Sequence, residues 1–516
     1  MTKVRFIQIF CTVVALTAFG VGFNQRTIIA AEKTAPVPEE DIQVLASGPI
    51  HGAFAEAVPF DPEPGIVAPK APPPLIEEIP PEQKPEGDVQ WIPGYWAWDD
   101  ERKEYIWVSG IWRVPPPDRQ WIPGYWAHVK ERYQWISGYW ASVKAKETEY
   151  LPEPPESVEV GPSSNAPSSD YIWMPGCWLW HHGRYAWRPG YWAHVNPDWV
   201  WVPAHYIWSP RGYIFVSGYW DFTIIHRGVL FAPVFFAPRV HLGLAFSFSP
   251  GFVINLNVFD DALFLRSRYW HYYYGNFYAP MYYRRGFYPW FSLHARRVAY
   301  DPIYAHQRWK HRKELGWESS LEKKFRERRD HEELRPPHSF NYQTLTNKKI
   351  STTGSKRPNF IISLDHADKT KASVYRFKHI SEKERMKFLQ QQKEVRTYQK
   401  KRQNREIQQQ NILKEKASKK PKPNKEKFSR SPIMNRSNEK MDRKKNPPTQ
   451  YKAPKPNPNV EPLKRRYDLS RSWEDSQKIE ETGQQSGTWE KSSREEFQKS
   501  GNKRGRSVDR MQKPNN

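Results

Sequence analysis

Residues 91–140 read WIPGYWAWDDERKEYIWVSGIWRVPPPDRQWIPGYWAHVKERYQWISGYW, and they contain one six-residue pattern four times. The pattern is Trp-x-x-Gly-x-Trp, and its first four copies begin at Trp91, Trp107, Trp121 and Trp135. Two further copies begin at Trp173 and Trp187, and two degenerate copies begin at Trp201, with Ala204 in place of Gly, and at Phe215. Within each group of four the copies start 14 or 16 residues apart, and a gap of 38 separates the groups. A constant period of this kind indicates a repeat architecture.

The period and the composition of the units predict an all-β fold. Every complete unit contains Gly and several contain Pro, which excludes a helix. Fourteen residues accommodate one strand of nine or ten residues and a tight turn. We therefore expect tandem antiparallel β-meanders in two four-stranded sets, at 89–141 and 171–221, joined by a linker at 142–170. The positions expected to act in structure or in stacking are Trp91, Gly94, Trp96, Trp107, Gly110, Trp112, Trp121, Gly124, Trp126, Trp135, Gly138, Trp140, Trp173, Gly176, Trp178, Trp187, Gly190, Trp192, Gly218 and Trp220.

The two tryptophans of a unit are five residues apart, which places them on opposite faces of a regular strand. A β-bulge at the Pro-Gly or Ser-Gly step would add one residue and return both to one face, and we favour this interpretation. The alternative is a two-residue Pro-Gly hairpin turn with the tryptophans facing across it. We rank it second because an L-Pro-Gly turn has the wrong twist for a tight hairpin.

These tandem units, preceded by Tyr-x-Trp as at Tyr133 and Trp135, resemble the YXWGXW (WXXGXW) repeat family of bacterial secreted proteins. The resemblance covers about residues 91–220. It implies a repeat class and an exported location, and it implies no activity.

The remaining chain is expected to comprise four regions. Residues 1–31, basic and then apolar, are typical of a signal peptide, with an uncleaved anchor as the alternative. Residues 32–88 contain 13 prolines and predict a disordered linker. Residues 222–340 predict an aromatic β region, with a hairpin at 242–258, followed by a helix at 303–335. Residues 341–516 predict a mostly disordered basic tail with a weak helix at 381–418.

The charge of the chain is concentrated in its second half. Residues 1–300 hold 25 Lys+Arg and 28 Asp+Glu, whereas residues 301–516 hold 55 and 28. Clusters of cationic side chains can bind polyanions with a strong salt dependence. The clusters considered for this role are Lys419, Lys420, Arg443, Lys444, Lys445, Lys464, Arg465 and Arg466.

No motif for catalysis, for a metal or for a cofactor emerges from the sequence. Cys177 is expected to be a packed residue, and His128 and His194 are expected to lie solvated at strand ends. Eighteen of the 24 tryptophans lie between Trp91 and Trp220, and we favour a role in the core over a role as sugar platforms. We thus expect a non-enzymatic exported protein of the periplasm, the cell envelope or the extracellular space, whose tail associates with anionic envelope polymer or lipid. A carbohydrate-binding module with exposed Trp and Tyr platforms is the alternative, and a nucleic-acid binder acting through the tail is a weaker one.

Overall fold

The computed structural model describes residues 41–238, 240, 246–292, 298–351, 358–369, 375–415, 424–427, 430–435 and 453–461. The chain divides into a unit Met1–Val460 and a unit Glu461–Asn516, and the architecture below is that of the first. The predicted signal peptide and all eight cationic residues of the tail clusters lie outside the described residues. Among the helices that are described, none combines the length and the apolar character needed to cross a membrane.

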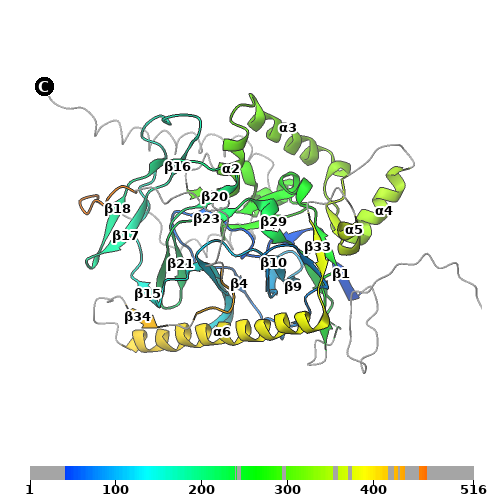
Figure 1. Cartoon of the computed structure of the whole chain (residues 1–516), viewed down its shortest axis with the longest axis horizontal. Coiled ribbons are helices and arrows are strands. Elements are labelled where there is room, and N and C mark those ends of the chain that lie inside the picture. The colour runs from blue at the N-terminus through cyan, green and yellow to red at the C-terminus, as the bar shows by residue number, and fades with distance from the viewer. Residues whose placement is uncertain are drawn as a thin grey trace, which may run out of the picture. The chain divides into compact units, whose positions relative to one another are not determined.

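The repeats form antiparallel hairpins, each built from two Trp-x-x-Gly-x-Trp units (Figure 1). The first hairpin comprises β7 (Gln90–Ile92), β8 (Tyr95–Asp99), β9 (Glu104–Val108) and β10 (Ile111–Arg113). The second comprises β11 (Arg119–Ile122), β12 (Tyr125–Val129), β13 (Arg132–Ile136) and β14 (Tyr139–Ser142). The third comprises β16 (Tyr171–Met174), β17 (Cys177–His181), β18 (Arg184–Arg188) and β19 (Tyr191–His194). The fourth comprises β20 (Trp199–Val202), β21 (His205–Ser209), β22 (Gly212–Val216) and β23 (Tyr219–Phe222).

This pairing confirms antiparallel β structure but not two four-stranded meanders. In each hairpin the two inner strands pair with each other and the two outer strands pair with each other, as β8 with β9 and β7 with β10. Successive hairpins are not joined by a pairing of β10 with β11 or of β19 with β20. The four strands of one hairpin are thus two long strands, each interrupted once, and the structural unit is two motifs.

The expected β-bulge is wrong, because the register is unbroken across the interruption. In the first hairpin Ile92 faces Ile111 and Tyr95 faces Val108, so two residues on each strand separate the paired segments. The same two-against-two spacing occurs in the other three hairpins. We call each such interruption a kink. Since no residue is added, the two tryptophans of a unit keep opposite faces, and both faces must be covered.

The segment predicted to be a disordered linker supplies much of that cover, and the prediction is wrong for residues 41–88. Its short strands are β1 (Ile42–Val44), β2 (Gly48–Pro49), β3 (Val58–Pro59), β4 (Val67–Ala68), β5 (Glu77–Glu78) and β6 (Gln83–Pro85). Pairings with β25 and β13 hold β1 and β4 at the sides of the first and second hairpins. Ile50, Phe54 and Ile76 are buried. A two-stranded hairpin is only marginally stable alone, because its edges and faces are open. This segment packs on those edges and faces despite its prolines. Part of the predicted linker 142–170 is also a strand, β15 (Glu147–Leu151), which pairs with β22.

The region after the repeats is β-rich as predicted, but the hairpin expected at 242–258 does not appear in its described part. The short strands here are β24 (Gly228–Val229), β25 (Val234–Phe236), β26 (Ser247–Phe248), β27 (Phe252–Ile254), β28 (Leu263–Arg266), β29 (His271–Tyr274), β30 (Phe287–Pro289) and β31 (Ala299–Tyr300). β26 pairs in parallel with β5, and β27 pairs with β32 (Ile361–Ser363). Both strands therefore find partners far away in the sequence, and the alternating apolar pattern could not distinguish these partners from a neighbour.

The helix expected at 303–335 is two helices, α2 (Pro302–Lys310) and α3 (Trp317–Asp330). Gly316 separates them in the left-handed region, with φ of 79°. Trp317 and Leu321 pack on the main core and Phe325 packs on a smaller cluster, so the predicted apolar face is real.

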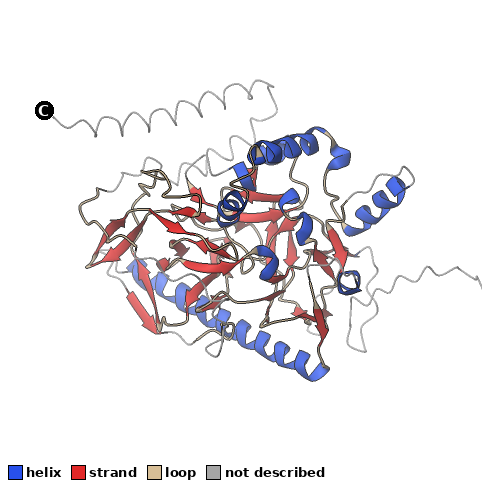
Figure 2. Cartoon of the chain, turned by 45° about the horizontal axis from the view of Figure 1, so that its top comes forward, coloured by secondary structure: helices blue, strands red, loops and turns tan. Residues whose placement is uncertain are grey.

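The C-terminal part contains more structure than the predicted tail. Its elements are α4 (Phe340–Ser351), β32, α5 (Leu364–Lys369), β33 (Phe377–His379), α6 (Glu382–Glu415) and β34 (Asn424–Lys427). The weak helix expected at 381–418 corresponds to α6, which runs along one side of the strands in Figure 2. Val395 and Tyr398 of α6 belong to the main core.

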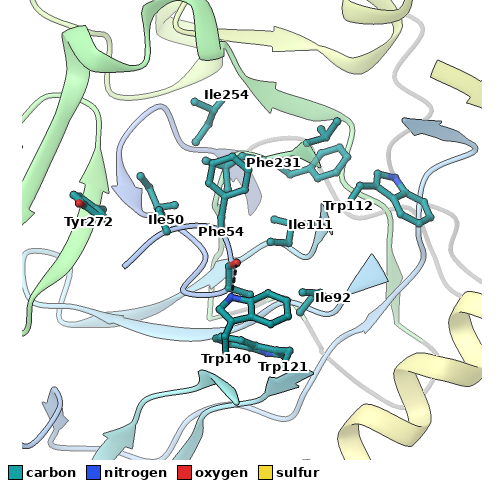
Figure 3. Packing of buried hydrophobic residues seen from close by; sticks show 14 of the residues in the cluster. Ile50, Phe54, Ile92, Ile111, Trp112, Trp121, Trp140, Phe231, Ile254 and Tyr272 are labelled. Atoms are coloured by element: carbon teal, nitrogen blue, oxygen red, sulfur yellow. Dashed lines mark hydrogen bonds between the residues drawn. The ribbon is translucent and has the colours of Figure 1, made fainter. Parts of the chain in front are cut away.

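The main core joins the outer tryptophans of the first two hairpins to the surrounding segments. Trp112, Trp121 and Trp140 lie close to Phe54 and Phe231 in Figure 3, and Trp91 belongs to the same cluster. The inner pair Trp96 and Trp107 belongs to a different cluster. The two faces of the first hairpin are therefore both apolar and both buried.

Candidate functional site

The tryptophans of each hairpin meet in facing pairs. Trp91 lies opposite Trp112 and Trp96 opposite Trp107, with ring centroids 5.1 Å apart in both pairs. The equivalent pairs in the other three hairpins have separations of 5.1–5.6 Å. No tryptophan is exposed in the part of the chain that the structure describes. This arrangement supports the predicted role in the core.

Each motif glycine lies under the ring of a tryptophan from the opposite strand. A Cβ on Gly138 would come within 2.5 Å of Trp121 Cζ2, and one on Gly110 within 2.6 Å of Trp91 Cζ2. The same approach of 2.3–2.9 Å occurs at the remaining motif glycines, which are Gly94, Gly124, Gly176, Gly190 and Gly218. Contacts this short leave no room for a methyl group, so the motif couples one glycine to one indole across the ladder.

The fourth hairpin departs from the motif at Ala204, Tyr206 and Phe215, and two of these positions, Ala204 and Phe215, correspond to one such couple. Ala204 stands at the position of Gly94, and Phe215 stands at the position of Trp107, whose ring covers that glycine. Because a phenyl ring is smaller than an indole, we expect it to leave more space for the alanine methyl group than Trp107 leaves at Gly94. The substitutions at Ala204 and Phe215 are therefore expected to compensate each other.

At the first kink the backbone amides bind a buried carboxylate. Glu78 accepts hydrogen bonds from the backbone N–H groups of Gly94 and Gly110, each at 2.9 Å, and from the Trp107 indole N–H at 3.0 Å. Burial raises the pKa of Glu78, and the three donors oppose that shift. The kink leaves amides outside the strand ladder, and a carboxylate satisfies them.

The third kink repeats this arrangement with a different residue. Glu159 accepts from the Gly176 amide and from the Trp173 indole N–H, the latter at 3.1 Å. Glu159 comes from the predicted linker 142–170, as Glu78 comes from 32–88. Each segment thus supplies an acid that holds the kink of the hairpin following it.

Other indole groups fasten the same segments to the repeats. Trp96 donates to the Pro74 carbonyl at 2.9 Å and Trp178 donates to the Glu156 carbonyl at 3.0 Å. Trp91 donates to Gln392 of α6 at 3.1 Å. The polar edge of the indole therefore binds the covering segment while its apolar body fills the core.

Two neighbouring cavities share Glu56, Trp135 and His271 in their linings. The first cavity lies between the first and second kinks and is also lined by His51, Tyr95 and side chains of α6. The second lies between residues 56–65, the second hairpin, the fourth hairpin and residues 268–271, and its open space is about 630 Å³ including solvent at its mouth. It brings together side chains from four separate parts of the sequence.

Burial shifts the pKa values of three histidines and one glutamate in these cavities toward the neutral forms. Loss of hydration lowers the pKa of His51 to about 3 and those of His205 and His271 to about 4. Burial also raises the pKa of Glu56 to about 8. His51 bonds to the Pro93 carbonyl through Nε2 at 3.2 Å and accepts from the Ala53 amide through Nδ1, so both its nitrogens are occupied.

The remaining predicted residues fall into three groups. His128 and His194 are exposed, as expected for strand ends, and Cys177 is buried, as expected for a packed residue. The cationic clusters from Lys419 to Arg466 lie outside the described residues. Over the described ranges, no three His, Cys, Asp or Glu side chains are grouped so as to hold a metal ion.

The sequence did not indicate Glu56, Glu78 or Glu159 as site residues. Each is an acid without a distinguishing motif in a segment whose composition predicted a linker. The available signal was the motif glycine at each kink. A Gly that interrupts two facing strands leaves backbone amides without partners, and these amides require an acceptor from elsewhere in the chain.

Comparison with protein families gives one match, to the WXXGXW repeat (2 copies), at residues 90–113, 121–141, 169–193 and 196–220. Each match contains two motifs and corresponds to one of the four hairpins. Neither the curated proteins nor the solved structures provide a match to this chain.

Proposed function

Residues 90–220 are built from WXXGXW repeats, and from this premise we propose that the protein is a non-enzymatic structural or interaction protein of the exported cell-envelope class. Its β region is a rigid body, and its cationic C-terminal region associates with anionic envelope polymer or lipid. The expected signal peptide belongs to the same proposal.

The charge distribution carries this proposal. Residues 401–516 hold 31 Lys+Arg against 15 Asp+Glu, whereas residues 1–300 are close to neutral. The tryptophans are used in packing, as their burial and their facing pairs indicate. The aromatic half is thus suited to form a scaffold, and the basic half is suited to bind a polyanion through electrostatic attraction.

The start of the basic region is already paired within the chain. Arg385 of α6 lies 3.0 Å from Glu82, and Lys393 lies 4.0 Å from Glu77. These contacts direct part of the helix charge toward the acidic 41–88 segment. The clusters that follow α6 are therefore the residues proposed to bind envelope material.

The test measures binding of the full chain to vesicles that contain phosphatidylglycerol and to neutral phosphatidylcholine vesicles. We expect binding only to the anionic vesicles, weakened by about tenfold or more between low and physiological salt. A variant with Arg443, Lys444, Lys445, Lys464, Arg465 and Arg466 changed to Gln should bind much more weakly. Salt-insensitive binding, or equal binding by the variant, would contradict the tether.

A carbohydrate-binding function is the second candidate. The burial of the tryptophans does not favour open ring platforms, but the second cavity is lined by several half-buried rings. A nucleic-acid binder acting through the tail is the weaker alternative. Binding of the full chain to duplex DNA, measured at the same two salt concentrations, would detect this activity.

A further inference from the structure

The second cavity has the lining of a binding site for a small polar ligand. It is enclosed by residues 56–65, by Trp135 of the second hairpin, by 205–208 of the fourth hairpin and by 268–271 after β28. Sites at the junction of separate structural parts are common positions for ligands. The walls combine aromatic rings with a few polar groups.

The aromatic part of the lining is only half-buried, unlike most tryptophans of the repeats. Trp135, Trp208, Tyr269 and Trp270 line the cavity, and each retains partial exposure. Trp270 also adopts φ of 53°, in the left-handed region that a bulky side chain rarely occupies. Such local strain persists where the surrounding structure holds it, and it is frequent at ligand sites. The turn between β28 and β29 thus places this indole at the cavity at a conformational cost.

The polar part of the lining includes three hydrogen-bond acceptors. His205 Nδ1 bonds to the Pro203 carbonyl at 2.9 Å, and His271 Nε2 bonds to the Ile50 carbonyl at 2.7 Å. Because those nitrogens carry the hydrogens, Nε2 of His205 and Nδ1 of His271 are acceptors. Neither has a partner among the described residues. The Glu56 carboxyl group, likewise without a hydrogen-bond partner in the described part of the chain, lines the same cavity.

We propose that this cavity binds a neutral saccharide, with a sugar ring against Trp208 and Trp270 and its hydroxyl groups donating to His205, His271 and Glu56. Hydroxyl groups match a lining of acceptors, and the apolar face of a sugar ring matches an indole face. The cavity is lined by both Arg268, which lies exposed, and Glu63, so its charged side chains do not favour a ligand of one sign. The proposal deepens the second candidate function and does not depend on the cationic tail.

The test measures binding to the full chain by isothermal titration calorimetry at low and high salt. The ligands are N-acetylchitotetraose, cellotetraose, maltotetraose and xylotetraose. We expect at least one of the four to bind, with an affinity that changes by less than about twofold with salt because the ligand is neutral. Trp208→Ala should weaken binding by about fivefold or more through loss of the aromatic contact. Glu56→Leu, which removes the acceptor at similar size, should also weaken it. Trp180→Ala, at a half-buried tryptophan of the third hairpin outside the cavity, should leave the affinity unchanged.

Three results would overturn the proposal. These are the absence of binding by all four saccharides, an equal loss of binding in Trp180→Ala and Glu56→Leu, or binding of tetramethylammonium in place of the sugars. Circular dichroism of each variant separates loss of the site from loss of the fold. Because vesicle binding is measured independently, failure of the sugar site leaves the tail proposal standing, and the reverse also holds.

Discussion

Gly138 and Trp121 face each other across the second hairpin so closely that the indole Cζ2 would lie 2.5 Å from a Cβ on the glycine. The ring of Trp121 also packs against Trp140, with centroids 5.2 Å apart. The glycine therefore determines where the indole lies, and the indole determines how the main core is filled. This relationship recurs in every hairpin and explains why the motif joins Gly to Trp.

Replacement of Gly138 by Ala should destabilise the protein by about 1–3 kcal/mol, because the methyl group overlaps the Trp121 ring. An Ala at a tolerated glycine position would instead stabilise slightly by restricting the unfolded chain. Urea unfolding measures the difference, with the neighbouring Ser137→Ala as control. An unchanged or increased free energy of unfolding in Gly138→Ala would show that the ring moves freely.

Replacement of Glu78 by Gln should destabilise the protein by about 2–3 kcal/mol, because an amide cannot accept all three hydrogen bonds and leaves a buried donor unsatisfied. Glu77→Gln, at the exposed neighbouring position, is the matched control and should change stability by less than about 0.5 kcal/mol. Thermal or chemical unfolding of both variants provides the test. Equal effects of the two substitutions would contradict a specific role for the carboxylate at the kink.

Substitution of Arg402 tests whether α6 contributes to the stability of the fold. Its guanidinium group bonds to Glu406 at 3.0 Å and donates to the Pro123 and Ser137 carbonyls of the second kink. Arg402→Ala leaves Glu406 buried without its cation and should cost about 3–5 kcal/mol. The exposed neighbour Lys401→Ala should have little effect on the free energy of unfolding. A small change in the free energy of unfolding at both positions would mean that α6 does not stabilise the fold.

Glu56 gives a prediction about pH. Its pKa rises from 4.5 to about 8 on folding, so the native protein holds one proton that the unfolded chain releases between these values. Its contribution to stability is therefore present below about pH 4.5 and is lost as the pH rises toward about 8. Glu56→Gln removes this contribution. The free energy of unfolding of the variant should therefore increase relative to that of the unmodified protein as the pH rises from about 5 to about 8.5. A stability difference that is the same at both pH values would contradict the shift.

The sequence was sufficient for the period, the β class and the core role of the indoles, because glycine and tryptophan at fixed spacing have few physical interpretations. It did not reveal which strands pair. The turn within the first hairpin contains Asp100 and Lys103, whereas the connection to the second contains Pro115, Pro116 and Pro117. For the first two hairpins this contrast between charged turns and a proline-rich connection was the available signal for pairs of motifs, whereas the turn of the fourth hairpin itself contains Pro210.

The partners of the covering segments could not be predicted for a different reason. The backbone amides that bind Glu78 lose their partners in the strand ladder only when the kink forms. No local sequence pattern therefore identifies Glu78 as their acceptor. The short strand β5 that contains it pairs with β26, which is 170 residues later in the chain. Composition predicted that residues 41–88 would be disordered, but the open faces of the hairpins decide their burial.

The central claim, that each glycine is coupled to the facing indole, is tested most directly by a double-mutant cycle at Ala204 and Phe215 in urea unfolding. Phe215→Trp alone should destabilise the protein, because the indole overlaps the alanine methyl group. Ala204→Gly together with Phe215→Trp should restore stability, giving a coupling free energy of at least about 1 kcal/mol. Additive effects of the two substitutions, with no coupling, would contradict the account.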